Sequence, residues 1–210
     1  MSAIAVIAKA PVAGHSKTRL CPPCTPEQAA TLAAAALADT LAAVAATPAL
    51  RHVVVLDGEP GPWLPDGFEV VAQRGGGLAE RLAAAFADIG EAALVIGMDT
   101  PQVTSRLLSQ ALDRLGRADA VLGPAPDGGY WTIGLRAADD AVFTGVPMSV
   151  AHTCAAQRAR LRALGLSTGE LPALRDVDTI ADAYAVAALA PASRFARELV
   201  GLRLHEVLAA

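Results

Sequence analysis

Short apolar runs alternate with longer alanine- and leucine-rich stretches along this chain, and this alternation constrains its fold more than any other feature. Strands are predicted at residues 3–8, 51–57, 68–73, 92–99, 119–125 and 128–135. Helices are predicted within 25–47, 75–90, 104–116, 149–165, 180–190 and 193–210, and 167–179 has the pattern of a strand followed by a loop. Strands that alternate with helices indicate an α/β fold with a mainly parallel sheet and helices on both of its faces.

The alternation breaks after about residue 125, because 119–125 and 128–135 are separated by a turn and not by a helix. An antiparallel part of the sheet is therefore expected there. The chain has 210 residues, enough for one large α/β domain or two small ones. No internal repeat or linker is visible, so a single domain over 1–210 is the simplest prediction.

Several predicted helix ends carry residues with a strong positional preference. Thr25 can act as the N-cap of the helix that follows, with Pro26 in the first turn and Glu27 beside it. Thr104 can cap the next but one helix in the same way. Pro191 separates the two closing helices.

Composition excludes several classes of protein. Hydrophobic residues make up 53% and charged residues 18%, which is typical of a globular chain, and the abundance of alanine suggests a GC-rich bacterial genome. The net charge of −4 and the absence of a basic run argue against nucleic acid as a partner. No membrane span is expected, and the N-terminus resembles a first strand more than a signal peptide. The expected location is the cytoplasm. The sequence does not decide whether the protein forms an oligomer.

Three cysteines raise the question of a metal or redox site. Cys21 and Cys24 form a Cys-Pro-Pro-Cys sequence with the spacing of half a zinc site, which would need two further ligands. The best candidates for these two ligands are His152 and Cys154, which lie far away in sequence. We therefore interpret Cys21 and Cys24 as loop cysteines, and the odd cysteine count argues against a disulfide framework.

The loop after the first predicted strand gathers positive charge. Lys9, Lys17 and Arg19 lie within eleven positions, and Pro11 and Gly14 impose turns between them. The sequence is not a nucleotide-triphosphatase phosphate loop, because that motif needs glycine directly before Lys-Ser/Thr. In an open α/β sheet, ligands bind beyond the carboxyl ends of the strands. The loop therefore predicts a site for a phosphate chain; the alternative is a solvated turn with scattered cations.

A second candidate site follows the strand at 92–99. Asp99 ends a very apolar run and is followed closely by Pro101, which places a carboxylate at the end of the sheet. Carboxylate oxygens are the ligands that Mg²⁺ and Mn²⁺ prefer. The alternative role, an N-cap, is already available from Thr104. We therefore predict that Asp99 binds a divalent metal ion.

Two further regions carry candidate residues. Asp127, Gly128 and Gly129 form a strong turn signal, and Tyr130 with Trp131 directly after them suggests a wall for a substrate ring. A simple hairpin turn is the alternative. Further on, "RDVDTIADAY" places Asp176, Asp178 and Asp182 near a helix start. Asp178 either caps that helix or reaches the same metal as Asp99.

Five motifs occur together in order: "KAPVAGHSKTRL", "GGGLAERLAAAF", "GMDTPQ", "GPAPDGGYWTIGL" and "DVDT". In this combination the chain resembles the radical-SAM/selenodomain-associated transferase 1 family, from about residue 3 to residue 182. That family belongs to the nucleotide-diphospho-sugar transferase superfamily. The resemblance implies a single-domain glycosyltransferase A fold and a transferase that uses a nucleotide or nucleotide sugar and a small-molecule acceptor.

The resemblance also implies roles for individual residues. The opening loop would hold the nucleotide phosphates, with Ala8, Lys9, Pro11 and Gly14 around them and Lys17 nearest. The glycine loop at 75–77, with Gly76 and Gly77, would lie beside the base. Asp99 would bind Mg²⁺ or Mn²⁺ with Asp178 as second ligand, and the turn of Asp127, Gly128, Gly129 and Tyr130 would face the acceptor or sugar. Lys17, Arg19 and Asp99 would be the catalytic residues.

One departure bears on the reaction. Sugar-transferring relatives usually have Asp-x-Asp at the metal strand, but here Pro101 takes the third position. This resembles the nucleotidyltransferase branch, such as the molybdenum-cofactor guanylyltransferases. The opening loop also resembles that of the lactyl-phosphate guanylyltransferases, but "DGGYWTIGL" is not expected in them, so that activity is not assigned. The resemblance therefore implies either nucleotidyl transfer from a nucleoside triphosphate to a small phosphorylated acceptor or glycosyl transfer from a nucleotide sugar. The alternative is a non-catalytic nucleotide-binding or partner-binding module that retains the fold.

Overall fold

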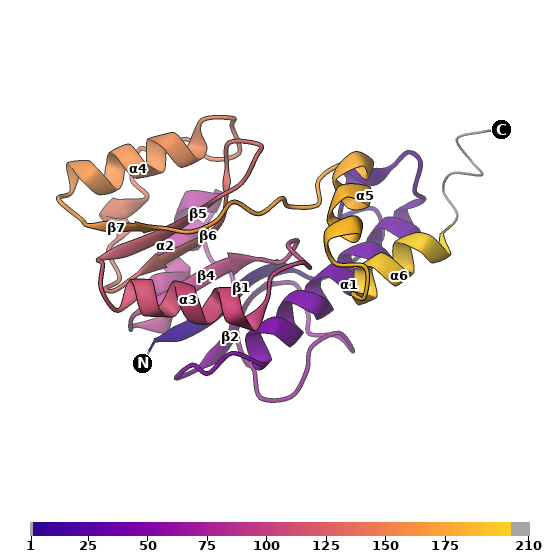
Figure 1. Cartoon of the computed structure of the whole chain (residues 1–210), viewed down its shortest axis with the longest axis horizontal. Helices are drawn as coiled ribbons and strands as arrows, with labels where there is room; N and C mark the ends of the chain where they lie inside the picture. The colour runs from indigo at the N-terminus through magenta and orange to yellow at the C-terminus, as the bar shows by residue number, and fades with distance from the viewer. Residues whose placement is uncertain (1, 203–210) are drawn as a thin grey trace.

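Seven strands form one sheet in the order β3-β2-β1-β4-β6-β5-β7 in the computed structural model, which describes residues 2–202 (Figure 1). The strands are β1 (Ala3–Lys9), β2 (His52–Asp57), β3 (Glu69–Ala72), β4 (Ala93–Gly97), β5 (Ala120–Pro124), β6 (Tyr130–Leu135) and β7 (Thr168–Glu170). β1 to β4 pair in parallel, and β7 is parallel to β5. β6 is antiparallel to both β4 and β5, so the antiparallel part predicted after residue 125 is confirmed.

Helices cover both faces of this sheet, as the alternation predicts. The α-helices are α1 (Pro26–Ala45), α2 (Leu78–Ile89), α3 (Ser105–Leu115), α4 (Thr153–Ala163), α5 (Ile180–Leu189) and α6 (Arg194–Gly201). Two short 3-10 helices, η1 (Thr18–Leu20) and η2 (Asp140–Val142), lie in connections. The predicted helix over 193–210 is present as α6, and its last residues lie outside the described part of the chain.

The strands separate their side chains between two cores with the period of two that a pleated strand imposes. In β1, Ala3 and Ala5 join the core under α2 and α4, whereas Ile4 and Val6 join the core under α1 and α3. All four side chains are fully buried. This is why the strand sequences are continuous apolar runs: both faces of a covered sheet need apolar side chains.

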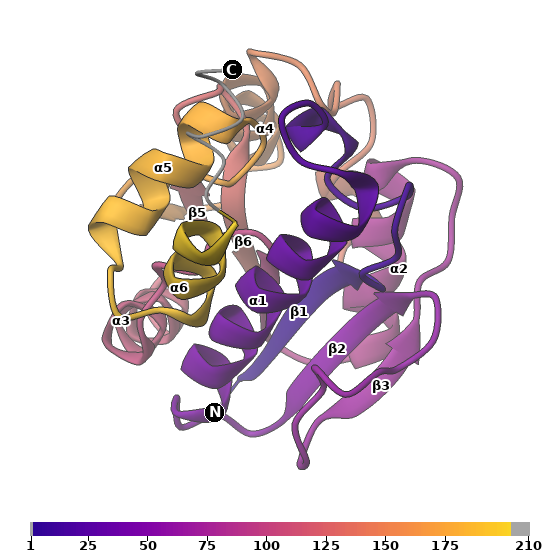
Figure 2. The same cartoon turned by 90° about the vertical axis from the view of Figure 1, so that its right-hand side faces the viewer.

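Helix α1 is long and apolar enough to cross a membrane by length and composition alone. The fold accounts for its apolar residues, because the helix packs on two sides. Leu37 and Leu41 contact the sheet core, whereas Ala29 and Leu32 pack in a third core with α5 and α6. Figure 2 shows α6 beside both α1 and α5. The hydrophobicity of α1 is thus that of a buried helix between two layers.

The predicted helix caps are present. Thr25 accepts a hydrogen bond from the Gln28 amide, and Gln28 completes a capping box. Thr104 caps α3 through the Leu107 amide. The alternative role of Asp178 as a helix cap is wrong, because Thr179 caps α5 and Asp178 remains free for other contacts.

Candidate active site

The carboxyl ends of β1 and β4 lie side by side and place the opening loop next to Asp99. The two strands pair in register from Ala3 opposite Ala93 to Ile7 opposite Gly97. Lys9 ends β1, and Asp99 follows β4 by two residues. The loop after β1 and the loop after β4 therefore open at the same edge of the sheet, where ligands bind in open α/β folds.

The segment of residues 171–178, here called the crossing segment, runs from β7 to α5 across this edge (Figure 1). Backbone hydrogen bonds anchor it at three places: the amides of Leu171, Leu174 and Val177 donate to the carbonyls of Leu122 at 3.0 Å, Pro124 at 3.2 Å and Asp99 at 3.0 Å, respectively. The Trp131 indole N–H adds a bond to the Pro172 carbonyl at 3.0 Å. These contacts hold the crossing segment in place, so that Asp176 and Asp178 lie at the carboxyl end of β4.

Three carboxylates meet at this point. Asp99, Asp176 and Asp178 each offer an oxygen, and these oxygens all lie within 4.8 Å of one another. It is the only group of three or more potential metal ligands found within residues 2–202. An all-oxygen donor set fits Mg²⁺ or Mn²⁺ and does not fit the softer metals that prefer sulfur or imidazole.

Lys17 is the cation closest to these carboxylates. Its ammonium donates to Asp99 at 2.5 Å and to the carbonyl of Val177, and lies 3.5 Å from Asp178. Only 12% of its side chain is exposed. Burial alone would lower the pKa of Lys17, but attraction to Asp99, with Asp178 and Asp176 beyond it, outweighs burial and raises that pKa. The lysine therefore stays charged.

The opening loop holds Lys17 in an unusual backbone conformation. Lys17 has φ of 50°, in the left-handed region that non-glycine residues rarely adopt. Just before it, the Ser16 hydroxyl accepts from the Val12 amide at 3.0 Å and donates to the Ala10 carbonyl at 3.2 Å, which closes the loop on itself. Gly14, with φ of 76°, supplies the turn. Such strain is common at functional sites.

Asp176 is the most perturbed carboxylate of the cluster. Burial, together with repulsion from Asp99, Asp127 and Asp178, raises its pKa to about 6. On the other side, Arg19 donates to Asp178 at 2.8 Å while most of its own side chain stays exposed. The three carboxylates thus carry more negative charge than Lys17 and Arg19 neutralise. An excess of negative charge of this kind favours a bound divalent cation.

Two cavities open on either side of the carboxylates. The first, here called the basic cavity, has a volume of about 340 Å³ and is lined by Lys9, His15, Lys17, Arg19, Asp99 and Asp178 among others. The second, the acidic cavity, has a volume of about 400 Å³, and its charged lining is Arg19, Asp99, Asp127, Asp176 and Asp178. Because Arg19, Asp99 and Asp178 line both, the two cavities meet at the carboxylate cluster.

The Asp-Gly-Gly turn is both a hairpin and a wall of the acidic cavity. It joins β5 to the antiparallel β6, and the Asp127 carboxylate accepts from the Gly129 amide at 2.8 Å. Gly128 has φ of 90°, and its carbonyl accepts from the Cys154 amide at 2.8 Å. A Cβ at Gly128 would lie 1.8 Å from the Ala151 carbonyl oxygen. Only glycine lets the turn pack against the segment before α4.

We expect Gly128→Ala to destabilise the fold by more than about 3 kcal/mol, because it combines a backbone clash with an unfavourable φ. Gly145→Ala is the matched control: Gly145 has φ of 74° but open space around its missing Cβ. That variant should lose only about 1 kcal/mol. Urea unfolding curves measure both, and equal losses would contradict the packing argument.

The structure brings most of the residues predicted for the site together. Lys17, Arg19, Asp99 and Asp178 meet at the carboxylate cluster, and Asp127, Gly129 and Tyr130 line the acidic cavity. Lys9 lines the basic cavity. Ala8, Pro11 and Gly14 are not among the lining residues of either cavity; they shape β1 and its loop.

Other predicted positions lie elsewhere. Gly76 and Gly77 precede α2 outside the lining of both cavities, and the Gly76 amide donates to Glu80 within the loop itself. The side chain of Trp131 is buried in the core, so the suggestion that it forms a substrate wall is wrong, although Tyr130 beside it does line the acidic cavity. Cys154 is buried in a different core from Cys24, which agrees with interpreting the cysteines as structural.

Sequence reasoning did not assign Asp176 to the metal site, although the signal was present. Asp176 and Asp178 are two residues apart in an extended segment, so their side chains lie on the same side of it while Val177 between them is buried. It also missed the segment 148–151, which lines the acidic cavity and packs against the Asp-Gly-Gly turn at Ala151. No residue pattern in that segment distinguishes it from an ordinary helix start.

The sheet order, the helices on both faces and the site at the strand ends define a fold of the nucleotide-diphospho-sugar transferase type. A crystal structure from Desulfovibrio desulfuricans G20, provisionally described as such a transferase, superposes with a TM-score of 0.85 and 29% identity over 99% of this chain and 97% of that one. Residues 29–150 match the family of uncharacterised proteins conserved in bacteria, DUF2064. The chain belongs to this family.

More distant structures share the fold. CMP:2-keto-3-deoxy-manno-octonic acid synthetase complexed with CTP superposes with a TM-score of 0.59 at 13% identity, over 91% of this chain and 99% of that one. A Mycobacterium tuberculosis H37Rv protein solved with manganese has a TM-score of 0.51 and 20% identity, over 89% of this chain and 97% of that one. No protein of curated function matches the sequence.

Proposed function

We propose that this protein is a metal-dependent transferase that takes its transferred group from a nucleoside triphosphate or a nucleotide sugar. The observation that carries the proposal is the pair of cavities joined by Asp99 and Asp178. One cavity carries the cations that a phosphate chain needs, and the other leaves room for an acceptor. A donor in the first cavity and an acceptor in the second would meet at the carboxylate cluster.

The residues fit a divalent metal ion. Asp99, Asp176 and Asp178 would hold it through carboxylate oxygens. Without it, burial and then repulsion from the neighbouring carboxylates raise the pKa of Asp176. When bound, Mg²⁺ or Mn²⁺ would neutralise negative charge on the donor phosphates and on the departing group. Two relatives of the same fold support this assignment, since one was solved with CTP and the other with manganese.

The chain's own cations would bind and orient the donor. Lys17 is fixed by Asp99 and the Val177 carbonyl, so its charge is held at the boundary between the cavities without any cost of ordering a free side chain. Arg19 is mostly exposed and lines both cavities, so it can contact phosphate oxygens while it remains paired with Asp178. Lys9 extends the positive wall of the basic cavity.

The two possible reactions break different bonds of the donor, and the product released distinguishes them. Nucleotidyl transfer releases pyrophosphate, because the acceptor oxygen bonds to the α-phosphorus of the triphosphate. Glycosyl transfer releases a nucleoside diphosphate, because the acceptor oxygen bonds to the sugar's anomeric carbon. In both cases positioning and charge neutralisation supply most of the catalysis, and the cluster provides both.

A thermal-shift matrix tests the proposal. Nucleoside triphosphates, diphosphates and nucleotide sugars are each added with and without MnCl₂, and ligands that bind the folded protein raise its Tm by mass action. We expect the largest rise where nucleotide and Mn²⁺ are present together. Binding that is indifferent to the metal, with no turnover of any donor, would instead support a non-catalytic nucleotide-binding module.

Replacement of Lys17 tests the phosphate side of the site. Lys17→Met is expected to weaken binding of pyrophosphate in the presence of Mn²⁺ by about tenfold or more, because a buried charge at the boundary of the basic cavity is lost. Lys9→Met provides the comparison, since the Lys9 side chain is about half exposed and should matter less. Isothermal titration calorimetry with both variants gives the affinities, and equal values for Lys17→Met and the wild type would remove Lys17 from the phosphate site.

A further inference from the structure

The two cavities differ sharply in the charges that line them. The basic cavity has three cations, Lys9, Lys17 and Arg19, against the two carboxylates of Asp99 and Asp178. The acidic cavity has four carboxylates against a single cation, Arg19. A ligand that must pass from solvent into the acidic cavity therefore meets a negative potential, whereas the phosphate chain of a donor is favoured on the other side.

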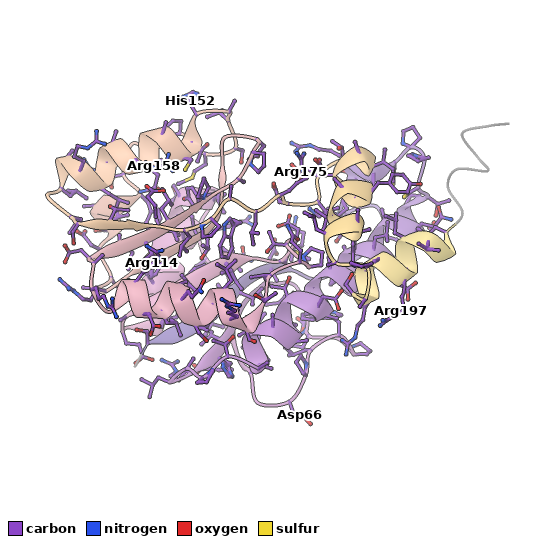
Figure 3. All side chains as sticks on the ribbon, viewed as in Figure 1. Asp66, Arg114, His152, Arg158, Arg175 and Arg197 are labelled. Carbon is purple, nitrogen blue, oxygen red and sulfur yellow. The ribbon has the colours of Figure 1, made fainter. Side chains whose placement is uncertain are left out.

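The one cation of the acidic cavity is already engaged. Arg19 donates to Asp178 at 2.8 Å, so part of its charge is balanced within the site. Two other arginines, Arg158 and Arg175, are labelled in Figure 3. Both are paired, since Arg158 donates to Glu170 and Arg175 donates to Asp182, and neither lines the acidic cavity. Arg19 also lines the basic cavity, where the donor phosphates would engage it. Among the described residues, the lining of the acidic cavity therefore offers no further cation for a second phosphate group.

A metal ion would not reverse this difference. Asp99, Asp176 and Asp178 would be its ligands, and the donor phosphates would bring further negative charge to the same point. Asp127 lies on the opposite wall, is exposed, and is outside the group of three that can hold a metal. It is nevertheless close enough to Asp176 to contribute to the raised pKa of that carboxyl. Asp127 therefore remains as an unneutralised hydrogen-bond acceptor in the cavity.

The rest of the lining suits a carbon framework. Leu78, Tyr130, Met148 and Val150 present apolar surface around the carboxylates. The Tyr130 hydroxyl is turned to Met148 and Gln157 and so leaves the ring as the surface available beside the cavity. An apolar wall that faces a carboxylate is the environment of a ring or chain that carries hydroxyl groups on one edge.

Resting on the proposed function, we infer that the acceptor is a hydroxyl-bearing compound without a phosphate group, and that Asp127 orients it by accepting a hydrogen bond from the attacking hydroxyl. In the transfer, the acceptor oxygen forms a bond to the electrophilic atom of the donor as that atom's bond to the leaving group breaks. The leaving group is pyrophosphate in nucleotidyl transfer and a nucleoside diphosphate in glycosyl transfer. The hydroxyl proton passes to the Asp127 carboxylate. A phosphorylated acceptor, which the resemblance to nucleotidyltransferases implied, would place a dianion against Asp127 and Asp176 with no cation to receive it.

Matched pairs of small molecules test this inference. Glycerol, glucose and myo-inositol are each compared with the corresponding phosphate monoester by isothermal titration calorimetry, after Mn²⁺ and pyrophosphate have filled the basic cavity. We expect the parent compound of at least one pair to bind at least about tenfold more tightly than its monoester, because the monoester adds like charge at close range. A monoester that binds as well as its parent, or a panel in which no parent compound binds, would overturn the inference.

Two isosteric variants locate the effect. Asp127→Asn keeps an oxygen for the Gly129 amide but removes the charge, and it should narrow the preference for the parent compound at least about fivefold. Asp139→Asn is the matched control, because the Asp139 carboxylate accepts from the Ala141 amide in a similar turn outside the cavity. An unchanged preference in Asp127→Asn would remove Asp127 from the acceptor site. Failure of Mn²⁺ and pyrophosphate to bind at all would contradict the proposed function itself, which separates the two failures.

Discussion

Asp99→Asn is expected to weaken Mn²⁺ binding by roughly 100-fold or more and to abolish the Mn²⁺-dependent part of nucleotide binding. Asp99 is the carboxylate that links the end of β4 to the crossing segment, since its backbone carbonyl also accepts from the Val177 amide at 3.0 Å. The substitution keeps that backbone bond and the shape of the side chain while it removes the charge. Calorimetric titration of Mn²⁺, then of a nucleotide with Mn²⁺ present, measures both losses.

The control for Asp99→Asn is Asp57→Asn, at the carboxyl end of the parallel strand β2, which β1 separates from β4. Asp57 pairs with Lys9 at 3.8 Å and with Arg81 at 3.3 Å, but it does not belong to the carboxylate cluster. Both variants remove one negative charge from the same edge of the sheet. If Mn²⁺ affinity fell equally in the two, the effect would come from the general potential of that edge, and Asp99 would lose its assignment as a ligand.

The fold and two of the three clustered carboxylates could be predicted from sequence, because these predictions depend on local pattern. The apolar runs predict β1 and β4, and parallel pairing of buried strands brings their carboxyl ends to one edge, so Lys17 and Asp99 could be expected to lie close together. Asp178 could be proposed as a second metal ligand, because it too offers carboxylate oxygens. What the pattern could not show is that Lys17 is bound to Asp99 directly and lies between the cavities, because the left-handed conformation of Lys17 is imposed by its loop.

The remaining residues depend on contacts between segments far apart in the chain. Asp176 reaches the cluster only because the crossing segment is tied down by Pro124, Asp99 and Trp131, three residues from three other parts of the sequence. The same hydrogen bond explains why Trp131 is a core residue and not a substrate wall: its indole N–H is bound to the carbonyl of Pro172. The local sequence around a tryptophan next to a turn does not show whether its side chain will be buried in the core or will line a binding site.

Replacement of Asp176 is expected to have opposite effects on stability with and without metal. In the metal-free protein its pKa is raised to about 6 from a usual value of 3.8, so the folded state binds this proton more tightly than the unfolded state does. A raised carboxyl pKa contributes stability at low pH that is lost as the pH rises from about 4 through about 6. At pH 7.5 the ionised carboxylate therefore costs on the order of 2 kcal/mol.

Asp176→Asn should remove that cost and raise the Tm of the metal-free protein at pH 7.5 by roughly 5 °C, with little change at pH 4. It should also lose most of the further rise that MnCl₂ gives the wild type, because one of the three ligands is gone. Asp182→Asn is the contrast in the same region, since the pKa of Asp182 is lowered despite partial burial, by its bonds to Thr179 and Arg175, and its loss should lower the Tm. A metal-free Tm that falls in Asp176→Asn would mean that the carboxylate makes favourable contacts at neutral pH, and the cluster would then be a structural charge network. A site that is destabilising when empty and stabilising when filled is what selection for binding, and not for folding, produces.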